Sequence, residues 1–129
     1  MDKSVWKRWE RWWADAIGGD AVNAVRNPVT GRSGRAGHVP DVESIKFALE
    51  VKAGKVVSSR TLKAVQQARD AGNATNKIPI VAQTHKVNQN TAVHLVTMEL
   101  DVFLDLTKDI RKEEMRIKKS LDSSKELGI

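Results

Sequence analysis

The sequence predicts an α/β or α+β fold with one central mixed β-sheet flanked by helices. The chain has 129 residues, which is enough for one domain with a single packed core. Helical periodicity marks the two ends of the chain and one middle segment, and alternating or β-branched runs lie between them. Segments that follow one another in this way are typical of a sheet packed against helices. We expect a single domain over residues 1–129, with a charged helical extension at about 108–129.

The first third of the chain predicts a helix, a strand and a loop. Residues 4–17 place four tryptophans on one broad stripe at helical spacing, and Gly18-Gly19 ends the helix. Residues 21–26 alternate loosely and predict a strand. Residues 27–37 contain three glycines and two arginines, which is typical of a basic loop.

Two strands are predicted next, near 38–45 and 46–53. In the second strand the side chains alternate, so that the two sets point to opposite faces. Phe47, Leu49 and Val51 point one way, and Ala48, Glu50 and Lys52 point the other. If these two strands form a hairpin, residues of the first reach the same place as residues of the second.

The second half predicts a helix, two strands and a long helix. Residues 59–71 are helical, and Gly72 closes this segment. The apolar residues expected to point inward are Leu62, Val65 and Ala68. Residues 78–83 predict a buried strand and residues 91–97 a β-branched one. Residues 99–125 predict one helix with apolar first turns and a solvated, mixed-charge remainder.

The composition excludes several classes of protein. The chain has no cysteine, so disulfides and thiolate metal sites are excluded. No apolar stretch approaches the ~20 residues of a membrane helix, and the charged N-terminus shows no signal peptide. We therefore expect a cytoplasmic protein without a membrane partner.

The net charge of +6 is unevenly distributed. Residues 1–77 carry 14 Lys and Arg against 8 Asp and Glu, whereas residues 78–129 carry 8 of each. An excess of positive charge confined to one region is expected of a surface that faces phosphates. The alternative is that the charge serves only solubility.

The motif that carries chemistry is Pro40-Asp41, followed by Glu50-Val51-Lys52. Strand alternation puts Glu50 and Lys52 on one face, ~7 Å apart, and Asp41 reaches the same place in a hairpin. Two carboxylates that converge make an oxygen site suited to Mg²⁺. Lys52 beside them would orient or deprotonate a water. The alternative is that Glu50 and Lys52 form an exposed salt bridge and that Pro40-Asp41 is an ordinary turn.

Together with Glu10, Arg26 and Ser33-Gly34, this motif resembles the Holliday-junction resolvases of archaea and their phage relatives, within the PD-(D/E)XK nuclease superfamily. The resemblance covers about residues 5–85. It implies a restriction-endonuclease-like core, a homodimer and a metal-dependent endonuclease with Mg²⁺, for which Mn²⁺ would substitute. If the chain is of phage origin, the resemblance also implies a location in the host-cell cytoplasm.

The resemblance also implies roles for individual residues. Asp41, Glu50 and Lys52 would be catalytic. The metal ligands would be Glu10, Asp41, Glu50 and the Val51 carbonyl. Arg26 and Ser33 would contact the scissile strand. Thr30-Gly31 is an equal candidate for the pair that Ser33-Gly34 represents. Gln66 and Gln67 are either site glutamines, as in some branches of the superfamily, or surface residues.

The loop over residues 31–37 suits a phosphate backbone because glycines allow close approach and arginines make bidentate contacts. We expect DNA contacts from Arg26, Arg32, Ser33, Arg35 and Lys55. The expected function is hydrolysis of DNA phosphodiesters at branched sites, with four-way junctions first. The alternatives are a flap- or end-directed nuclease of the same fold and a basic DNA-binding protein without catalysis.

Overall fold

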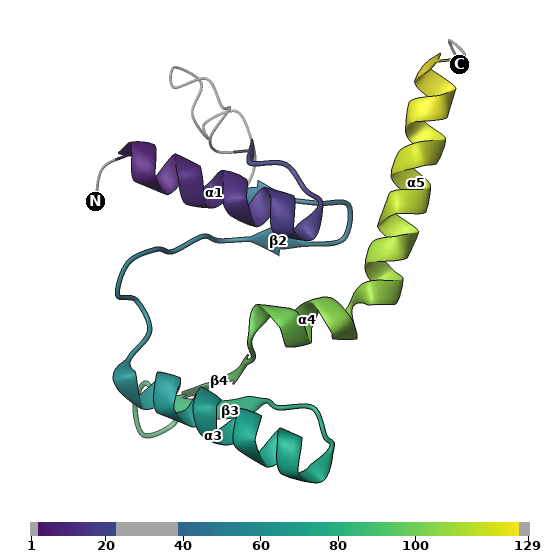
Figure 1. Cartoon of the computed structure of the whole chain (residues 1–129). Helices are drawn as coiled ribbons and strands as arrows, with labels where there is room; N and C mark the ends of the chain where they lie inside the picture. The colour runs from purple at the N-terminus through teal and green to yellow at the C-terminus, as the bar shows by residue number, and fades with distance from the viewer. Residues whose placement is uncertain (1–2, 23–38, 127–129) are drawn as a thin grey trace. The chain divides into compact units, whose positions relative to one another are not determined.

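The computed structural model describes residues 3–22 and 39–126, which form a mixed α+β protein (Figure 1). The elements are α1 (Lys3–Ile17), β1 (Val42–Glu43), β2 (Ala48–Leu49), α3 (Ser59–Thr75), β3 (Val81–Lys86), β4 (Ala92–Thr97), α4 (Leu100–Leu106) and α5 (Lys108–Glu126). The predicted α+β class is confirmed. The strands described form two separate antiparallel pairs, β1–β2 and β3–β4, so a single central mixed sheet stays a prediction.

The chain divides into two compact units. Unit 1 comprises Met1–Gly54 and Lys108–Ile129, and unit 2 comprises Lys55–Thr107. Unit 1 therefore holds α1, the β1–β2 hairpin and α5, and unit 2 holds α3, the β3–β4 hairpin and α4. None of the helices in the described ranges is long and apolar enough to cross a membrane.

The core of unit 1 lies where α1 packs along the β1–β2 hairpin (Figure 1). Its buried apolar residues are Ala14, Ile17, Val42 and Val51, and Trp9, Trp13, Ala21, Phe47 and Leu49 pack around them. The hairpin turn closes through Ser44, whose N–H donates to the Phe47 carbonyl (2.8 Å) and whose Oγ accepts the Phe47 N–H (3.1 Å). A serine that bonds nearby backbone favours such a turn, so the two strand segments meet as predicted, although they are shorter than expected.

The end of α1 touches the hairpin directly. Gly18 adopts a left-handed conformation (φ 71°) that ends the helix. A Cβ on Gly19 would lie 2.6 Å from the Glu43 carbonyl oxygen, so only glycine fits this close approach. Asp20 then forms a β-bridge with Glu43. The strand predicted over 21–26 lies mostly outside the described residues.

Helix α3 of unit 2 is longer than predicted. Ser58 caps its start, where the Ser58 Oγ accepts the Thr61 N–H (3.1 Å). Gly72 was expected to close the helix, but the helix continues to Thr75 and left-handed Asn76 (φ 54°) caps it. Gly72 serves packing instead, because a Cβ there would lie 2.7 Å from the Lys77 carbonyl oxygen.

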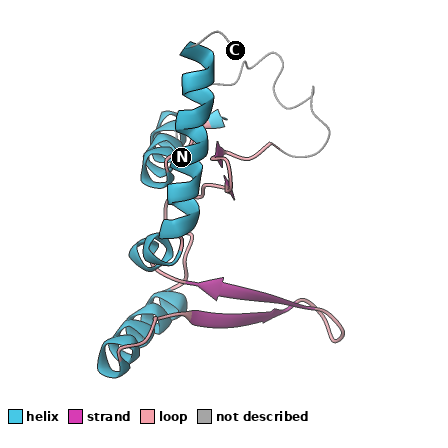
Figure 2. Cartoon of the chain, turned by 90° about the vertical axis from the view of Figure 1, so that its right-hand side faces the viewer, coloured by secondary structure: helices cyan, strands magenta, loops and turns pink. Residues whose placement is uncertain are grey.

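The β3–β4 hairpin is regular over six pairs, from Val81↔Thr97 to Lys86↔Ala92 (Figure 2). The prediction of a buried strand over 78–83 was wrong in both position and burial. The strand begins at Val81, and the side chains of Ile78 and Ile80 are 55% and 45% exposed. Leu62 of α3, expected to point inward, is 58% exposed. Propensity and pattern predict a strand here, but burial depends on what packs against it.

The predicted helix over 99–125 is in fact two helices, α4 and α5, that meet at Thr107. The Thr107 hydroxyl donates to the Phe103 carbonyl (2.7 Å), and the Thr107 N–H bonds the same oxygen (3.0 Å). A threonine that bonds back to the preceding turn bends or interrupts a helix. The predicted C-terminal helical extension corresponds to α5.

Candidate functional site

Asp41 is held against the residues on both sides of Glu50. Its backbone N–H donates to the Leu49 carbonyl (3.0 Å), and its Oδ2 accepts the Val51 N–H (2.9 Å). Val42 is already paired with Leu49, so two successive residues of one strand face a single residue of the other. This is the arrangement of a β-bulge, which re-aims the side chain of the extra residue. The Asp41 carboxylate is thereby fixed beside Glu50-Val51 with only 6% of the residue exposed.

The alternation predicted for the second strand is confirmed. Leu49 and Val51 pack in the core of unit 1, whereas Ala48, Glu50 and Lys52 are exposed. Glu50 and Lys52 therefore share the outer face of the hairpin, as the sequence indicated. The buried Val51 between them is the residue whose N–H the Asp41 carboxylate accepts.

Glu10 of α1 is buried, with 8% of the residue exposed. We expected it at the edge of the tryptophan stripe, but it lies on the same helix face as Ala14 and Ile17, the two most buried apolar residues of α1. Trp12, on the far side of the helix, is 47% exposed. The face of α1 that packs in the core therefore carries Glu10 beside Ala14 and Ile17.

The structure does not gather the three predicted carboxylates into one metal centre. Within residues 3–22 and 39–126, no three His, Cys, Asp or Glu side chains form a group that would hold a metal ion. The hairpin brings Asp41 to the Val51 backbone, next to Glu50 in the chain. The convergence of the Asp41 and Glu50 carboxylates and the ligand role of Glu10 stay predictions. Because Mg²⁺ uses only one or two protein carboxylates and keeps several waters, two carboxylates and a carbonyl are chemically suited to it.

Most of the predicted DNA contacts lie outside the described residues: these are Arg26, Arg32, Ser33 and Arg35, together with the alternative hydroxyl of Thr30. Lys55 is described and exposed, and it is the first residue of unit 2. The role of all these residues in DNA binding stays a prediction.

Gln66 and Gln67 are both exposed on α3. The Gln66 amide donates to Asp70 (3.0 Å) and accepts from Arg69 (3.2 Å). Arg69 also makes two bonds to the Glu99 carboxylate, at 2.9 and 2.6 Å. These bonds lower the pKa of Glu99 and raise that of Arg69. Gln66 is thus a member of a surface network of unit 2.

Sequence reasoning missed one buried acid, Glu114 of α5, which is only 6% exposed. Its Oε2 accepts the Lys46 N–H at the β1–β2 turn (3.3 Å). The adjacent Glu113 is exposed, and a hydrogen bond from Arg116 lowers its pKa, with a smaller contribution from the Lys46 charge. The sequence offers only the helical spacing of Glu114 with Ile110, Ile117 and Leu121. Ile110 and Leu121 are themselves 44% and 60% exposed, so this stripe does not account for the burial of Glu114.

Comparison with known proteins gives no relative: no family model, no curated protein and no solved structure matches the chain. The resemblance to resolvases therefore depends on the motif residues alone.

Proposed function

We propose that this protein is a Mg²⁺-dependent endonuclease that hydrolyses DNA phosphodiesters at branched sites. The observation that carries the proposal is the hairpin in which Asp41 is bonded to the backbone on both sides of Glu50. An exposed salt bridge between Glu50 and Lys52 would not require a buried aspartate at the same place. The PD-(D/E)XK resemblance supplies the reaction, and four-way junctions are its first expected substrate.

Asp41, Glu50 and the Val51 carbonyl are the groups that would hold the metal, with Glu10 as a further ligand and Mn²⁺ as a substitute ion. When bound, the metal would polarise the phosphoryl oxygen and lower the pKa of a water. The Val51 N–H fixes the orientation of the Asp41 carboxylate before any ligand arrives. A carboxylate accepts several bonds at once, so this N–H is compatible with a ligand role.

Lys52 would act on the attacking water or balance charge on the phosphate. It is exposed on the same face as Glu50, so its ammonium is accessible to a DNA strand that approaches the hairpin. Because Val51 between them is anchored in the core, the backbone that carries both side chains has little freedom to move. Such positioning is what phosphoryl transfer chiefly requires from a protein.

The DNA surface would be formed by Arg26, Arg32, Ser33, Arg35 and Lys55, in the region that carries the whole excess of positive charge. Phosphate contacts from such a region give affinity that falls with salt. The proposal includes a nuclease core with one central mixed sheet. It also includes a cytoplasmic location.

The proposal includes a homodimer, because resolution of a four-way junction needs two symmetrically placed cuts and a two-fold dimer supplies two related sites. Exposed large apolar residues supply surface for such an interface, including Trp12 of α1 and Leu106 of α4.

The decisive test is a nicking assay on linear, flap and four-way DNA in Mg²⁺. Asp41→Asn and Glu50→Gln should abolish cleavage and leave DNA binding largely intact, because each removes a metal ligand without reducing the positive surface. Glu43→Gln is the matched control, an exposed acid of the same hairpin, and should cut at the wild-type rate. Cleavage by Glu50→Gln at that rate would refute the site. DNA binding without metal-dependent cleavage by the wild type would favour the non-catalytic DNA-binding protein.

Light scattering tests the dimer separately. A mass near twice the 14.3 kDa of one chain, with paired nicks across a junction, supports the resolvase. A monomer that makes single nicks would favour a flap- or end-directed nuclease.

A further inference from the structure

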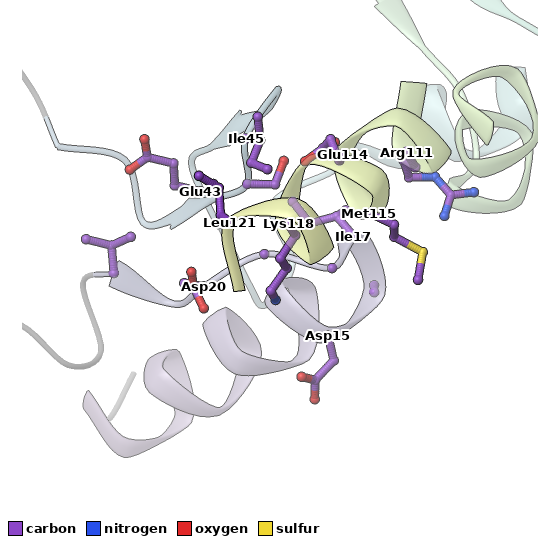
Figure 3. Close-up of a pocket in the computed structure, with 15 residues that line it drawn as sticks. Asp15, Ile17, Asp20, Glu43, Ile45, Arg111, Glu114, Met115, Lys118 and Leu121 are labelled. Carbon is purple, nitrogen blue, oxygen red and sulfur yellow. The ribbon is translucent and has the colours of Figure 1, made fainter. Parts of the chain in front are cut away.

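Helix α1 carries a stripe of exposed side chains on the side that does not pack against the β1–β2 hairpin. Arg8, Arg11, Trp12 and Asp15 follow one another at helical spacing, and Lys7 lies one turn before Arg11. All five are exposed. Figure 3 looks into a cavity of about 540 Å³ that the end of α1 forms with the β1–β2 turn and α5, and Asp15 points away from the other labelled residues of its lining. This α1 stripe therefore faces away from the rest of unit 1.

Trp12 is the aromatic residue of the α1 stripe, and its ring is held in place although 47% of the residue is exposed. The ring lies edge to face with both neighbouring indoles. Its centroid is 5.9 Å from that of Trp9, at an interplanar angle of 64°, and 5.2 Å from that of Trp13, at 79°. Trp9 and Trp13 pack in turn around the core of unit 1. A ring that is already ordered offers its exposed surface to a ligand at little cost in conformational entropy.

The charges of the α1 stripe are mainly positive. Lys7, Arg8 and Arg11 precede Trp12, and Asp15 follows it one turn later, which leaves a surplus of two positive charges. Neither Lys7 nor Arg11 forms an ion pair with a residue that the structure describes, and the guanidinium of Arg8 lies 5.7 Å from the centre of the Trp9 ring. Cations beside an exposed aromatic ring are the combination by which proteins bind single-stranded nucleic acid, because the cations contact phosphates and the ring stacks on a base.

Two other partners fit the α1 stripe less well. A helix that lies in a membrane surface buries a broad apolar face in lipid, but the apolar face of α1 is covered by the hairpin, where Ala14 and Ile17 are 5% and 4% exposed. A two-fold contact centred on Trp12 would bring the cations of two chains toward one another, and like charges across an interface repel. Other exposed apolar residues, such as Leu106, stay available for the dimer.

We propose that the α1 stripe binds unpaired DNA, with a base stacked on Trp12 and the adjacent phosphates on Lys7, Arg8 and Arg11. The inference rests on the proposed function for the choice of DNA, since flaps and open branch points expose unpaired bases. Bases inside a duplex stack on one another and have no free face for an indole. The α1 stripe would thus distinguish a branch from a duplex, a task that the Asp41 and Glu50 carboxylates do not perform.

The test is fluorescence anisotropy of a labelled short oligothymidylate with the full chain, without Mg²⁺, so that the result does not depend on cleavage. An abasic oligomer of the same length has the same phosphates but no base that could stack. We expect the wild type to bind the abasic oligomer about tenfold more weakly. Equal affinity for the two oligomers would overturn the proposal.

Substitutions then locate the stacking site. Trp12→Leu keeps an apolar side chain without an aromatic face, so it should bind oligothymidylate about tenfold more weakly and lose the preference for bases. Trp12→Phe is the conservative variant and should retain most of that preference. Circular dichroism checks that each variant is folded. A preference for bases that persists in a folded Trp12→Leu would refute the assignment to Trp12.

The cations are tested by salt dependence, which also decides the matter if Trp12→Leu does not fold. Lys7→Gln and Arg11→Gln should each reduce the slope of log affinity against log salt by about 0.7, the value for one phosphate contact on a single strand. Lys119→Gln, exposed on α5 outside the stripe, should leave the slope unchanged. Equal slopes in all three variants and the wild type would refute the phosphate contacts.

Further measurements separate the other partners and the nuclease. Trp12→Leu should keep the mass of the wild type in light scattering, and vesicles of phosphatidylglycerol should not displace the oligomer. A loss of mass, or displacement that depends on Trp12, would overturn the proposal in favour of a dimer contact or a membrane surface. Nicking without a preference for bases would refute this inference alone, whereas a preference for bases in a protein that does not nick would refute the nuclease alone.

Discussion

The two hairpins of this molecule differ in a way that length alone would not predict. β1–β2 in unit 1 pairs only two residues per strand, whereas β3–β4 in unit 2 pairs six. Yet the buried apolar residues lie at the short hairpin, where Val42 is fully buried, and Val96 of the long hairpin is 64% exposed. A regular ladder satisfies backbone groups, but burial comes from the surface that another element lays over the strand.

Helix α1 supplies that surface in unit 1. Ala14 and Ile17 face Val42 and Val51, and Gly19 removes the Cβ that would hold the helix end away from the hairpin. Helix α3 packs against β3, but Gly72 is its single buried residue in the described chain. One hydrogen bond joins α3 to the hairpin, from the Gln83 amide to the Thr61 hydroxyl (2.8 Å), and Gln83 also accepts from Thr97 within the hairpin (2.8 Å).

The largest expected effect is on DNA cleavage and concerns Lys52 of unit 1, the proposed catalytic lysine. Lys52→Met should lower the turnover of DNA cleavage by about 10²–10⁴-fold, as loss of a group that acts on the attacking water does. Lys46→Met in the same hairpin turn and Lys55→Met at the start of unit 2 should change mainly affinity and its salt dependence. Single-turnover kinetics at several salt concentrations separate these effects. Equal losses for all three variants would make Lys52 a phosphate contact.

The next effect concerns stability. Val42→Ala removes two methyl groups from the fully buried site and should destabilise the protein by about 2 kcal/mol. Val96→Ala removes the same atoms from an exposed strand position and should cost less than about 0.5 kcal/mol. Urea denaturation measures both. If both variants lowered the urea midpoint by a similar amount, Val96 would be buried in solution, and the two hairpins would not differ in burial.

The two units are alike in that each has a glycine with no room for a Cβ, Gly19 in unit 1 and Gly72 in unit 2. Alanine at Gly19 would place a Cβ 2.6 Å from the Glu43 carbonyl oxygen, and alanine at Gly72 would place one 2.7 Å from that of Lys77. Both contacts are with backbone, which cannot move aside as a side chain does. Each substitution should cost about 1–3 kcal/mol by overpacking, measured as a lower thermal midpoint. If Gly72→Ala left the thermal midpoint unchanged while Gly19→Ala lowered it, the backbone of unit 2 would be able to move aside and that of unit 1 would not.

The smallest effect belongs to the exposed Arg69–Glu99 ion pair of unit 2. Its hydrogen bond lowers the pKa of Glu99, so the pair stabilises the folded state above the unfolded pKa of glutamate. That contribution disappears as the pH falls through the lower, folded value. We expect an NMR titration of Glu99 to lie below the ordinary range, and Glu99→Gln to remove a small part of the acid sensitivity. If Glu99 titrated at the same pH in an Arg69→Met variant, the hydrogen bond from Arg69 would not be the cause of its lowered pKa.

Patterns within a few residues allowed correct predictions. The helices near 4–17 and 59–71 follow from apolar periodicity and end signals, and the alternation through Phe47 and Val51 correctly assigned the two faces of the second strand. The segments that carry Asp41 and Glu50 pair because a hairpin needs only a short turn between two such segments. The break at Thr107 and the extension of α3 past Gly72 were missed, since each depends on one side-chain or backbone contact.

By itself, the sequence determined the α+β class, the hairpin and the acid, acid, lysine order along it, because each follows from local backbone geometry. Only the tertiary structure decided that Asp41 accepts the Val51 N–H, that Glu10 lies on the buried face of α1 and that Glu114 is buried beside a cavity. The same structure left the long β3–β4 hairpin exposed. The physical reason is that periodicity specifies which face of an element is apolar, whereas burial is a property of two surfaces in contact.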